Sequence, residues 1–140
     1  MIDVTAEVLM VEDNIHDAEL TMLALKKGGL DRYVFVVKDG AEAVDFIFAK
    51  GKYEQRQVSS KLKVIILDLK LPKLDGFEVL EKMRADKSFD TIPVVIHSSS
   101  AVEDDIKRAY ELGANSYVVK PIDFAEHSRS ITSAVSYWIN

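Results

Sequence analysis

The sequence has 140 residues, of which 48% are hydrophobic, with a net charge of −5 and no cysteine. This length predicts one domain that buries roughly 68–70% of its unfolded surface, so the core needs no disulfide or thiolate-bound metal. The acidic charge argues against general affinity for nucleic acid, which depends on clustered Lys and Arg. No apolar run approaches the roughly 20 residues that span a bilayer, and the N-terminus lacks the basic start of a signal peptide. We therefore expect a cytoplasmic protein without membrane contact.

The first 50 residues predict two strand-helix pairs. Apolar runs at 8–11 and 33–37 indicate strands, and the first of them ends on acids. Asn14 or Asp13 can cap the helix after the first strand, and Gly28-Gly29 can end it. The expected apolar faces are Ile15, Ala18, Met22 and Leu25 in the first helix, and Ala41, Val44, Ile47 and Phe48 in the second. Residues 51–61 show no apolar period, so we expect an exposed connection there.

The central stretch, residues 64–76, reads V-I-I-L-D-L-K-L-P-K-L-D-G. Its four consecutive apolar residues predict a strand covered on both faces, as in a parallel sheet. Because a carboxylate does not belong inside such a strand, we expect Asp68 at its carboxyl end, where open α/β sheets bind ligands. Pro72 cannot continue the strand, and Asp75-Gly76 supplies the turn and the start of a third helix.

Two more strands are predicted at 93–97 and 115–119, the first followed by a helix that Gly113 ends and the second by a last helix from about Asp123. The expected apolar faces are Phe77, Leu80 and Met83 or Arg84 in the third helix, Val102, Ile106, Ala109 and Tyr110 in the fourth, and Phe124, Ile131, Val135 and Trp138 in the fifth, with Tyr137 and Ile139 adding bulk. Five strands alternating with five helices, without a linker, predict an α/β fold with a doubly wound parallel sheet.

The strand ends carry the chemistry. In the strand order 2-1-3-4-5, Glu12, Asp13 and Asp68 meet at the switch point, with the Ser98 hydroxyl and the Lys120 ammonium alongside. Three carboxylates within about 5 Å repel by roughly 3 kcal/mol per pair at an effective dielectric constant of about 20, so the cluster favours a bound cation. Because the ligands are hard oxygens, Mg²⁺ or Mn²⁺ is preferred to Zn²⁺.

Lys120 and Ser98 can then contact a phosphate oxygen, an arrangement that indicates phosphoryl transfer. No His, Cys or Lys stands where the metal would lie, so Asp68 is the candidate nucleophile and would form an acyl phosphate. Simpler interpretations exist for each residue alone. The acidic pair can cap a helix, Lys120 can be an exposed loop residue, and Ser98 can cap the fourth helix.

Four motifs resemble the receiver domain of two-component response regulators, and they cover essentially the whole chain. They are V-E-D at 11–13, L-D-L-K-L-P-K-L-D-G at 67–76, P-V-V-I-H-S-S at 93–99 and G-A-N-S-Y-V-V-K-P at 113–121. The resemblance implies a flavodoxin-like receiver fold over residues 1–140 with no output domain. It implies a signalling protein that accepts a phosphoryl group from a histidine kinase and catalyses only its own phosphorylation and dephosphorylation.

The resemblance also implies roles at the site, with Asp68 as phosphoacceptor. Asp13 would hold Mg²⁺ directly, Glu12 through water and Lys70 through its backbone carbonyl. Lys120 would pair with the phosphate.

For the switch, the resemblance implies the Ser98 hydroxyl and the Tyr117 ring as moving parts, and a cis peptide bond before Pro121. Taken alone, Tyr117 can equally be a packing residue. The surface of the fourth helix, fifth strand and fifth helix would change on phosphorylation and could form a homodimer. A phosphotransfer shuttle in a phosphorelay is an alternative, and the downstream target is not identified.

The nearest likeness within the family is to small stand-alone regulators paired with phytochrome-type kinases. Shared features are the long loop after the second helix, the run Y-E-L-G-A-N-S-Y at 110–117 and a Y-W pair near the end. Three residues depart from the family pattern: Ser98 replaces the commoner Thr, Lys70 is charged at a variable position, and His97 replaces an aliphatic residue. We expect His97 to be a hydrogen-bonded core histidine.

Two other functions start from the same residues. A phosphatase of the haloacid dehalogenase type would use Asp68 as nucleophile, but it needs a second Asp where this chain has Lys70. A flavodoxin-like nucleotide binder needs a phosphate loop rich in Ser, Thr and Gly, whereas Glu12 and Asp13 would repel a phosphate.

Overall fold

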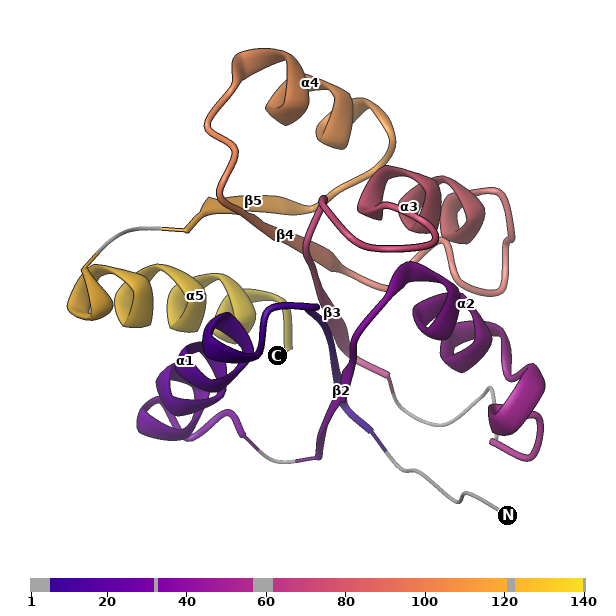
Figure 1. The fold of residues 1–140 in the computed structure, drawn as a ribbon, viewed down its shortest axis with the longest axis horizontal. Helices are drawn as coiled ribbons and strands as arrows, with labels where there is room; N and C mark the ends of the chain where they lie inside the picture. The colour runs from indigo at the N-terminus through magenta and orange to yellow at the C-terminus, as the bar shows by residue number, and fades with distance from the viewer. Residues whose placement is uncertain (1–5, 32, 57–61, 121–122, 140) are drawn as a thin grey trace.

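The computed structural model describes residues 6–31, 33–56, 62–120 and 123–139. Strands and helices alternate from β1 to α5 (Figure 1), as the sequence predicts. The elements are β1 (Val8–Val11), α1 (Ile15–Lys27), β2 (Val34–Val37), α2 (Gly40–Phe48), the 3₁₀ turn η1 (Gly51–Tyr53), β3 (Val64–Leu67), α3 (Gly76–Arg84), β4 (Val94–Ser98), α4 (Glu103–Glu111), β5 (Ser116–Val119) and α5 (Phe124–Ile139).

The five strands form one sheet in the order β2-β1-β3-β4-β5, and every neighbouring pair is parallel. This confirms the predicted doubly wound sheet. Helices α1 and α5 lie side by side on one face, and α2, α3 and α4 lie on the other (Figure 1). Strands β1 and β3 are neighbours in register, with Val11 opposite Leu67, so the residues that follow them emerge together at the carboxyl edge.

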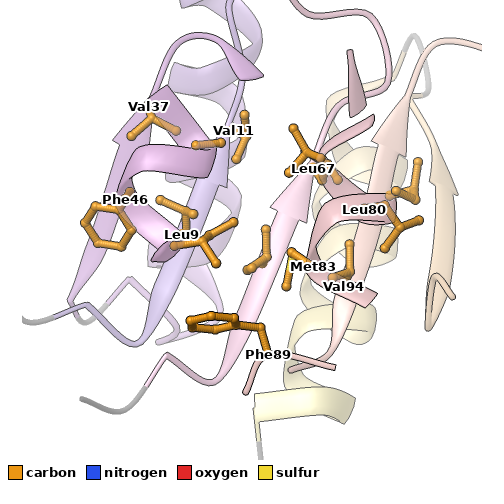
Figure 2. Packing of buried hydrophobic residues seen from close by; sticks show 14 of the residues in the cluster. Leu9, Val11, Val37, Phe46, Leu67, Leu80, Met83, Phe89 and Val94 are labelled. Carbon is orange, nitrogen blue, oxygen red and sulfur yellow. The ribbon is translucent and has the colours of Figure 1, made fainter. Parts of the chain in front are cut away.

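Each face of the sheet has its own apolar core. Strands β1, β3 and β4 send alternate side chains to the two faces, and all their residues are buried. Figure 2 shows part of the larger core, in which Leu9 and Leu67 of the sheet pack with Phe46 of α2 and Leu80 of α3. The second core joins the sheet to α1 and α5. The central strands are therefore anchored from both sides, which gives the carboxyl edge a rigid support.

Polar side chains begin the first three helices. Asn14, Asp39 and Asp75 each accept a hydrogen bond from the backbone N–H three residues later, at 2.7–3.0 Å. Asp75 forms a full capping box with Glu78. Asn14, rather than Asp13, is thus the cap of α1, which leaves Asp13 free of that role.

Gly76 brings the start of α3 against the end of β3. A Cβ atom at this position would lie 2.2 Å from the carbonyl oxygen of Asp68 and 2.8 Å from the Cα of Leu69. The backbone N–H of Gly76 donates to the carbonyl of Leu69 at 2.8 Å. Only glycine allows this close approach, so Gly76 helps to set the backbone beside Asp68.

Of the predicted exposed connection at residues 51–61, four of the six described residues are exposed, but Tyr53 and Arg56 are not, so the prediction is wrong for these two. Tyr53 is buried at 2% exposure, and its hydroxyl donates to Glu42 at 2.6 Å. The buried Arg56 donates from Nε to the carbonyl of Phe46 at 2.6 Å and from Nη2 to that of Ile47 at 2.9 Å. These are carbonyls of the last turn of α2, which need partners, so a cation there is favourable. Residues 57–61 lie outside the described part.

Three predicted helix faces also need correction. Ile15 is 63% exposed, because the first turn of α1 lies beyond the carboxyl edge and has no strand to cover. In α4 only Ala109 is buried, while Val102 and Tyr110 are exposed by 59% and 48%. In α2 the buried aromatic residue is Phe46, which the predicted face omitted.

Among the residues that the structure describes, no helix combines the length and the apolar character needed to cross a membrane. The longest, α5, has 16 residues.

We expect the Gly76→Ala substitution to lower the free energy of unfolding by about 3 kcal/mol, because the added methyl meets backbone atoms that cannot rotate away. Gly29→Ala is the matched control. Gly29 has φ +70° and no atom near its Cβ position, so the cost is only the left-handed backbone, about 1 kcal/mol. Urea unfolding measures both variants, and a Gly76→Ala cost no greater than that of Gly29→Ala would contradict the tight contact.

Candidate functional site

The ammonium of Lys120 is the centre of the site at the carboxyl edge. Its Nζ lies 2.7 Å from Glu12 Oε1, 2.8 Å from Asp68 Oδ2 and 2.9 Å from Asp17 Oδ2. Lys120 follows β5, and its backbone N–H donates to the carbonyl of Ser98 at 2.8 Å, which ties it to the end of β4. The interpretation of Lys120 as an exposed loop residue is therefore wrong, since only 13% of its side chain is exposed.

Glu12 and Asp68 are buried at the ends of β1 and β3, with 4% and 6% exposure. The sheet ladder continues through their backbones: the N–H of Glu12 donates to Val37 at 3.0 Å and that of Asp68 to Val11 at 3.1 Å. Asn14 N–H donates to the Glu12 carboxylate at 3.2 Å. The sheet and its first loop thus hold both carboxylates in place.

Asp13 completes a cluster of acids with Glu12 and Asp68. Each offers one carboxylate oxygen, and these oxygens lie within 4.8 Å of one another. Asp13 is exposed, while the other two are buried. Hard oxygen donors at this spacing, with one facing solvent, fit a divalent cation that keeps part of its water shell. A cavity of about 400 Å³ opens beside Asp13, with Lys70 and Ser100 among its lining residues.

Lys70 lies two residues after Asp68, with its side chain exposed. Its backbone N–H donates to Asp68 Oδ1 at 3.3 Å. The predicted metal contact through the Lys70 carbonyl is not tested by these contacts and stays a prediction. Pro121, the predicted cis proline, lies outside the described residues.

Ser98, at the end of β4, and Ser100, in the loop before α4, make different contacts. Ser98 is fully buried, and its hydroxyl accepts the N–H of Ser100 at 3.1 Å. Ser100, not Ser98, serves α4: its hydroxyl accepts the N–H of Val102 at 3.3 Å and donates to Asp105 at 2.6 Å. The Tyr117 hydroxyl donates to the carbonyl of Ser100 at 2.8 Å. The loop before α4 is thus bonded to β5 through Tyr117.

Charge and burial shift the pKa values at the site. Burial alone would lower the pKa of Lys120, but its hydrogen bonds to Asp68, Glu12 and Asp17 outweigh this and raise it. Burial raises the pKa of Glu12, helped by the charge of Asp68 and opposed by Lys120. Independently of these shifts, the carboxyl groups of Glu12, Asp13, Asp17 and Asp68 outnumber the single Lys120 ammonium, which favours binding of a cation.

Two residues of this neighbourhood escaped prediction. Asp17 follows Asp13 by four residues and stands in the first turn of α1, spacing that could have indicated a position near the strand ends. His127 falls on the apolar period of α5 between Phe124 and Ile131, which could have indicated burial.

His97 and His127 form a buried ring pair beneath the site, with ring centroids 5.0 Å apart. Their exposures are 2% and 6%. The expectation of a hydrogen-bonded His97 is wrong for Nε2, which finds no hydrogen-bond partner among the described residues, and His127 Nδ1 finds none there either. Burial, reinforced by His127 and Lys120, lowers the pKa of His97 to about 3. Burial also lowers the pKa of His127.

The fold and the site together define a class: a parallel α/β protein whose switch point carries three acids and a lysine suited to phosphoryl chemistry. Residues 8–132 match the family described as the response regulator receiver domain. The chain belongs to this family.

Known relatives agree in sequence and structure. The chain is 34% identical over 132 residues to response regulator Rcp1 of Synechocystis sp., covering 94% of this chain and 88% of Rcp1. The Mn²⁺-bound structure of Rcp1 matches with a TM-score of 0.85 at 33% identity, covering 95% of this chain and 94% of that one. The phosphorylated cyanobacterial phytochrome response regulator RcpA matches with a TM-score of 0.86 at 34% identity, covering 98% of this chain and 96% of RcpA. The bacteriophytochrome response regulator AtBRR matches with a TM-score of 0.76 at 44% identity, covering 94% of this chain and 93% of AtBRR. The predicted resemblance to phytochrome-associated regulators is confirmed.

We expect the protein to lose stability on acidification because of His97. In the unfolded chain a histidine has a pKa near 6.5, whereas the folded value is about 3, so only the unfolded state gains a proton between these values. The free energy of unfolding therefore has its full value above pH about 6.5. It falls as the pH drops, and at pH 5 it is lower by about 2 kcal/mol because of His97. His97→Leu should show a correspondingly weaker loss between pH 7 and pH 5 in urea unfolding.

His16→Gln is the control for this measurement, because His16 is exposed on α1. It should keep the pH dependence of the unmodified protein. An equal pH dependence in His97→Leu and the unmodified protein would show that His97 does not carry this effect.

Proposed function

We propose that the protein accepts a phosphoryl group on Asp68 from a phosphohistidine of a histidine kinase. The observation that carries this is the contact of Lys120 Nζ with Asp68 Oδ2 at 2.8 Å, inside a cluster of three carboxylates. A buried carboxylate paired with a cation at the carboxyl edge can act as a nucleophile while the cation offsets charge on the incoming group. Membership of the receiver family supports the same conclusion.

In the proposed step an Asp68 oxygen forms a bond to phosphorus as the bond from phosphorus to the histidine nitrogen of the kinase breaks. The electron pair of that bond leaves with the imidazole. Lys120 stays protonated and pairs with a phosphoryl oxygen, and the Ser98 hydroxyl offers a second contact. Glu12, Asp13, Asp68 and the Lys70 carbonyl would hold Mg²⁺, which when bound supplies positive charge to the phosphoryl oxygens.

We infer that the kinase is of the phytochrome type. Support comes from relatives described as a cyanobacterial phytochrome response regulator and as a bacteriophytochrome response regulator, at 34% and 44% identity.

We further propose that α4, β5 and α5 form the responding surface and a homodimer contact. Large apolar side chains are exposed on these elements or next to them: Val102 just before α4, Tyr110 on α4, Val119 on β5 and Tyr137 on α5. The bond from Tyr117 to the loop before α4 offers a route from Ser98 to this surface, through a rearrangement of that loop. The switch roles of Ser98 and Tyr117 are part of this proposal.

Acetyl phosphate with Mg²⁺ should place about one base-labile phosphoryl group on each chain, and Asp68→Asn should abolish it because an amide is not a nucleophile for phosphorus. Chelation of the metal should slow labelling strongly. Asp104→Asn, an exposed acid on α4, is the matched control and should be labelled normally. Intact-mass spectrometry with and without alkaline treatment gives the readout. Labelling of Asp68→Asn equal to that of the unmodified protein would remove Asp68 from this role.

Beryllium fluoride, a mimic of the phosphoryl group, should double the mass measured by analytical ultracentrifugation. Tyr110→Glu should prevent this, since it places a charge among the exposed apolar side chains of the proposed contact. Leu20→Glu, at a comparably exposed position on α1, should dimerise normally. A Tyr110→Glu protein that still doubles its mass would exclude this surface as the dimer contact.

A further inference from the structure

Asp17 supplies the third carboxylate bonded to Lys120. Its Oδ2 accepts a hydrogen bond from Nζ at 2.9 Å. An ammonium has three donor hydrogens, and here all three point to carboxylates: those of Glu12, Asp68 and Asp17. The three partners together define one position for Nζ above the phosphoacceptor.

Asp17 differs from Glu12 and Asp68 because it has no second role in binding the cation or the phosphoryl group. Glu12 and Asp68 belong to the cluster of acids that fits a divalent cation, and Asp68 must also present an oxygen to the phosphoryl donor. Their oxygens therefore change partners during the proposed reaction. Asp17 is outside that cluster, so its bond to Lys120 need not break when the other carboxylates are engaged.

The local structure holds Asp17 for this task. It lies in the first turn of α1, and its backbone N–H donates to the capping side chain of Asn14 at 3.0 Å. The cap directly follows Glu12 and Asp13, so Asp17 belongs to the same short chain segment as these two acids. The Asp17 side chain is 36% exposed, and an ion pair with that much access to water contributes little to stability. Its position is better explained by what it does to Lys120.

We propose that Asp17 is a positioning residue that keeps the Lys120 ammonium over Asp68 during phosphoryl transfer. This inference rests on the function proposed above. In the step tested, an Asp68 oxygen bonds to the phosphorus of acetyl phosphate, and the bond from phosphorus to the acetate oxygen breaks with its electron pair on acetate. Lys120 keeps its proton throughout. Asp17 touches neither the donor nor the phosphorus and acts only through Lys120.

Positioning and simple charge make different kinetic predictions. A mispositioned Lys120 stabilises the transferring group less, which lowers the maximal rate at saturating donor. Loss of a negative charge near the site reduces repulsion of the anionic donor, which lowers KM and leaves the maximal rate unchanged. The two roles are therefore separated by measuring labelling rates over a range of acetyl phosphate concentrations.

With the full chain and saturating Mg²⁺, Asp17→Ala should lower the maximal labelling rate about tenfold. Asp17→Glu should recover most of the rate, because the longer carboxylate can still reach Nζ. Glu19→Ala is the matched control: it removes one exposed acid from the same helix without contact to Lys120, and it should keep the maximal rate of the unmodified protein. Thermal unfolding checks that each variant is folded, and Asp17→Asn, which keeps the shape of the side chain, replaces Asp17→Ala if that protein does not fold.

A double-mutant cycle tests whether Asp17 acts through Lys120. In a Lys120→Ala background, Asp17→Ala should cause no further loss of maximal rate, because the group it positions is absent. An equal loss in both backgrounds would overturn the inference, as would a maximal rate in Asp17→Ala equal to that in Glu19→Ala. Both results leave the proposed function intact. Absence of labelling in the unmodified protein would instead overturn the proposed function.

Discussion

The buried Lys120 offsets the repulsion between the carboxylates that the fold brings together at the edge of the sheet. Glu12 and Asp68 have 4% and 6% exposure, and two such carboxylates without a counter-ion would repel each other strongly. Lys120 lies within 2.9 Å of both and of Asp17. Removing one partner from a buried ion pair costs roughly 3–5 kcal/mol, because the other charge is left uncompensated. The same arrangement leaves excess negative charge, and that excess makes the site receptive to a cation and a phosphoryl group.

The sheet makes this meeting possible. The groups of the site come from the ends of β1, β3 and β5 and from the first turn of α1, and in the order β2-β1-β3-β4-β5 these ends lie at one edge of the parallel sheet. Apolar cores on both faces fix the strands, so the charged residues lie at the end of the sheet and outside the apolar cores. Gly76 extends this rigidity to the backbone of Asp68, where α3 approaches too closely for any side chain. His97 of β4 and His127 of α5 pack against each other, so the contact between the sheet and α5 extends to the region beneath Lys120.

Interpretation of the sequence succeeded where a local pattern has one structural meaning. Strands β1 and β3 have the predicted bounds, because four consecutive apolar residues ending on an acid leave little choice of boundary. It failed where burial depends on a distant neighbour. Ile15 fits the apolar period of α1 but lies beyond the edge of the sheet, and Tyr53 and Arg56 sit in a polar segment yet pack against α2. The periodic spacing of apolar residues indicates which side chains share a helix face, but it does not indicate whether another element packs against that face.

The sequence by itself determined the parallel sheet, the acids and lysine at the strand ends, and the family, since each follows from apolar runs and motifs that are local in the chain. Only the tertiary structure decided which groups meet. Lys120 is 103 residues from Asp17, and His97 is 30 residues from His127, and no local pattern encodes those pairings. They arise because the crossovers return each chain segment to the same edge of one sheet, where short-range charge and packing then select the partners.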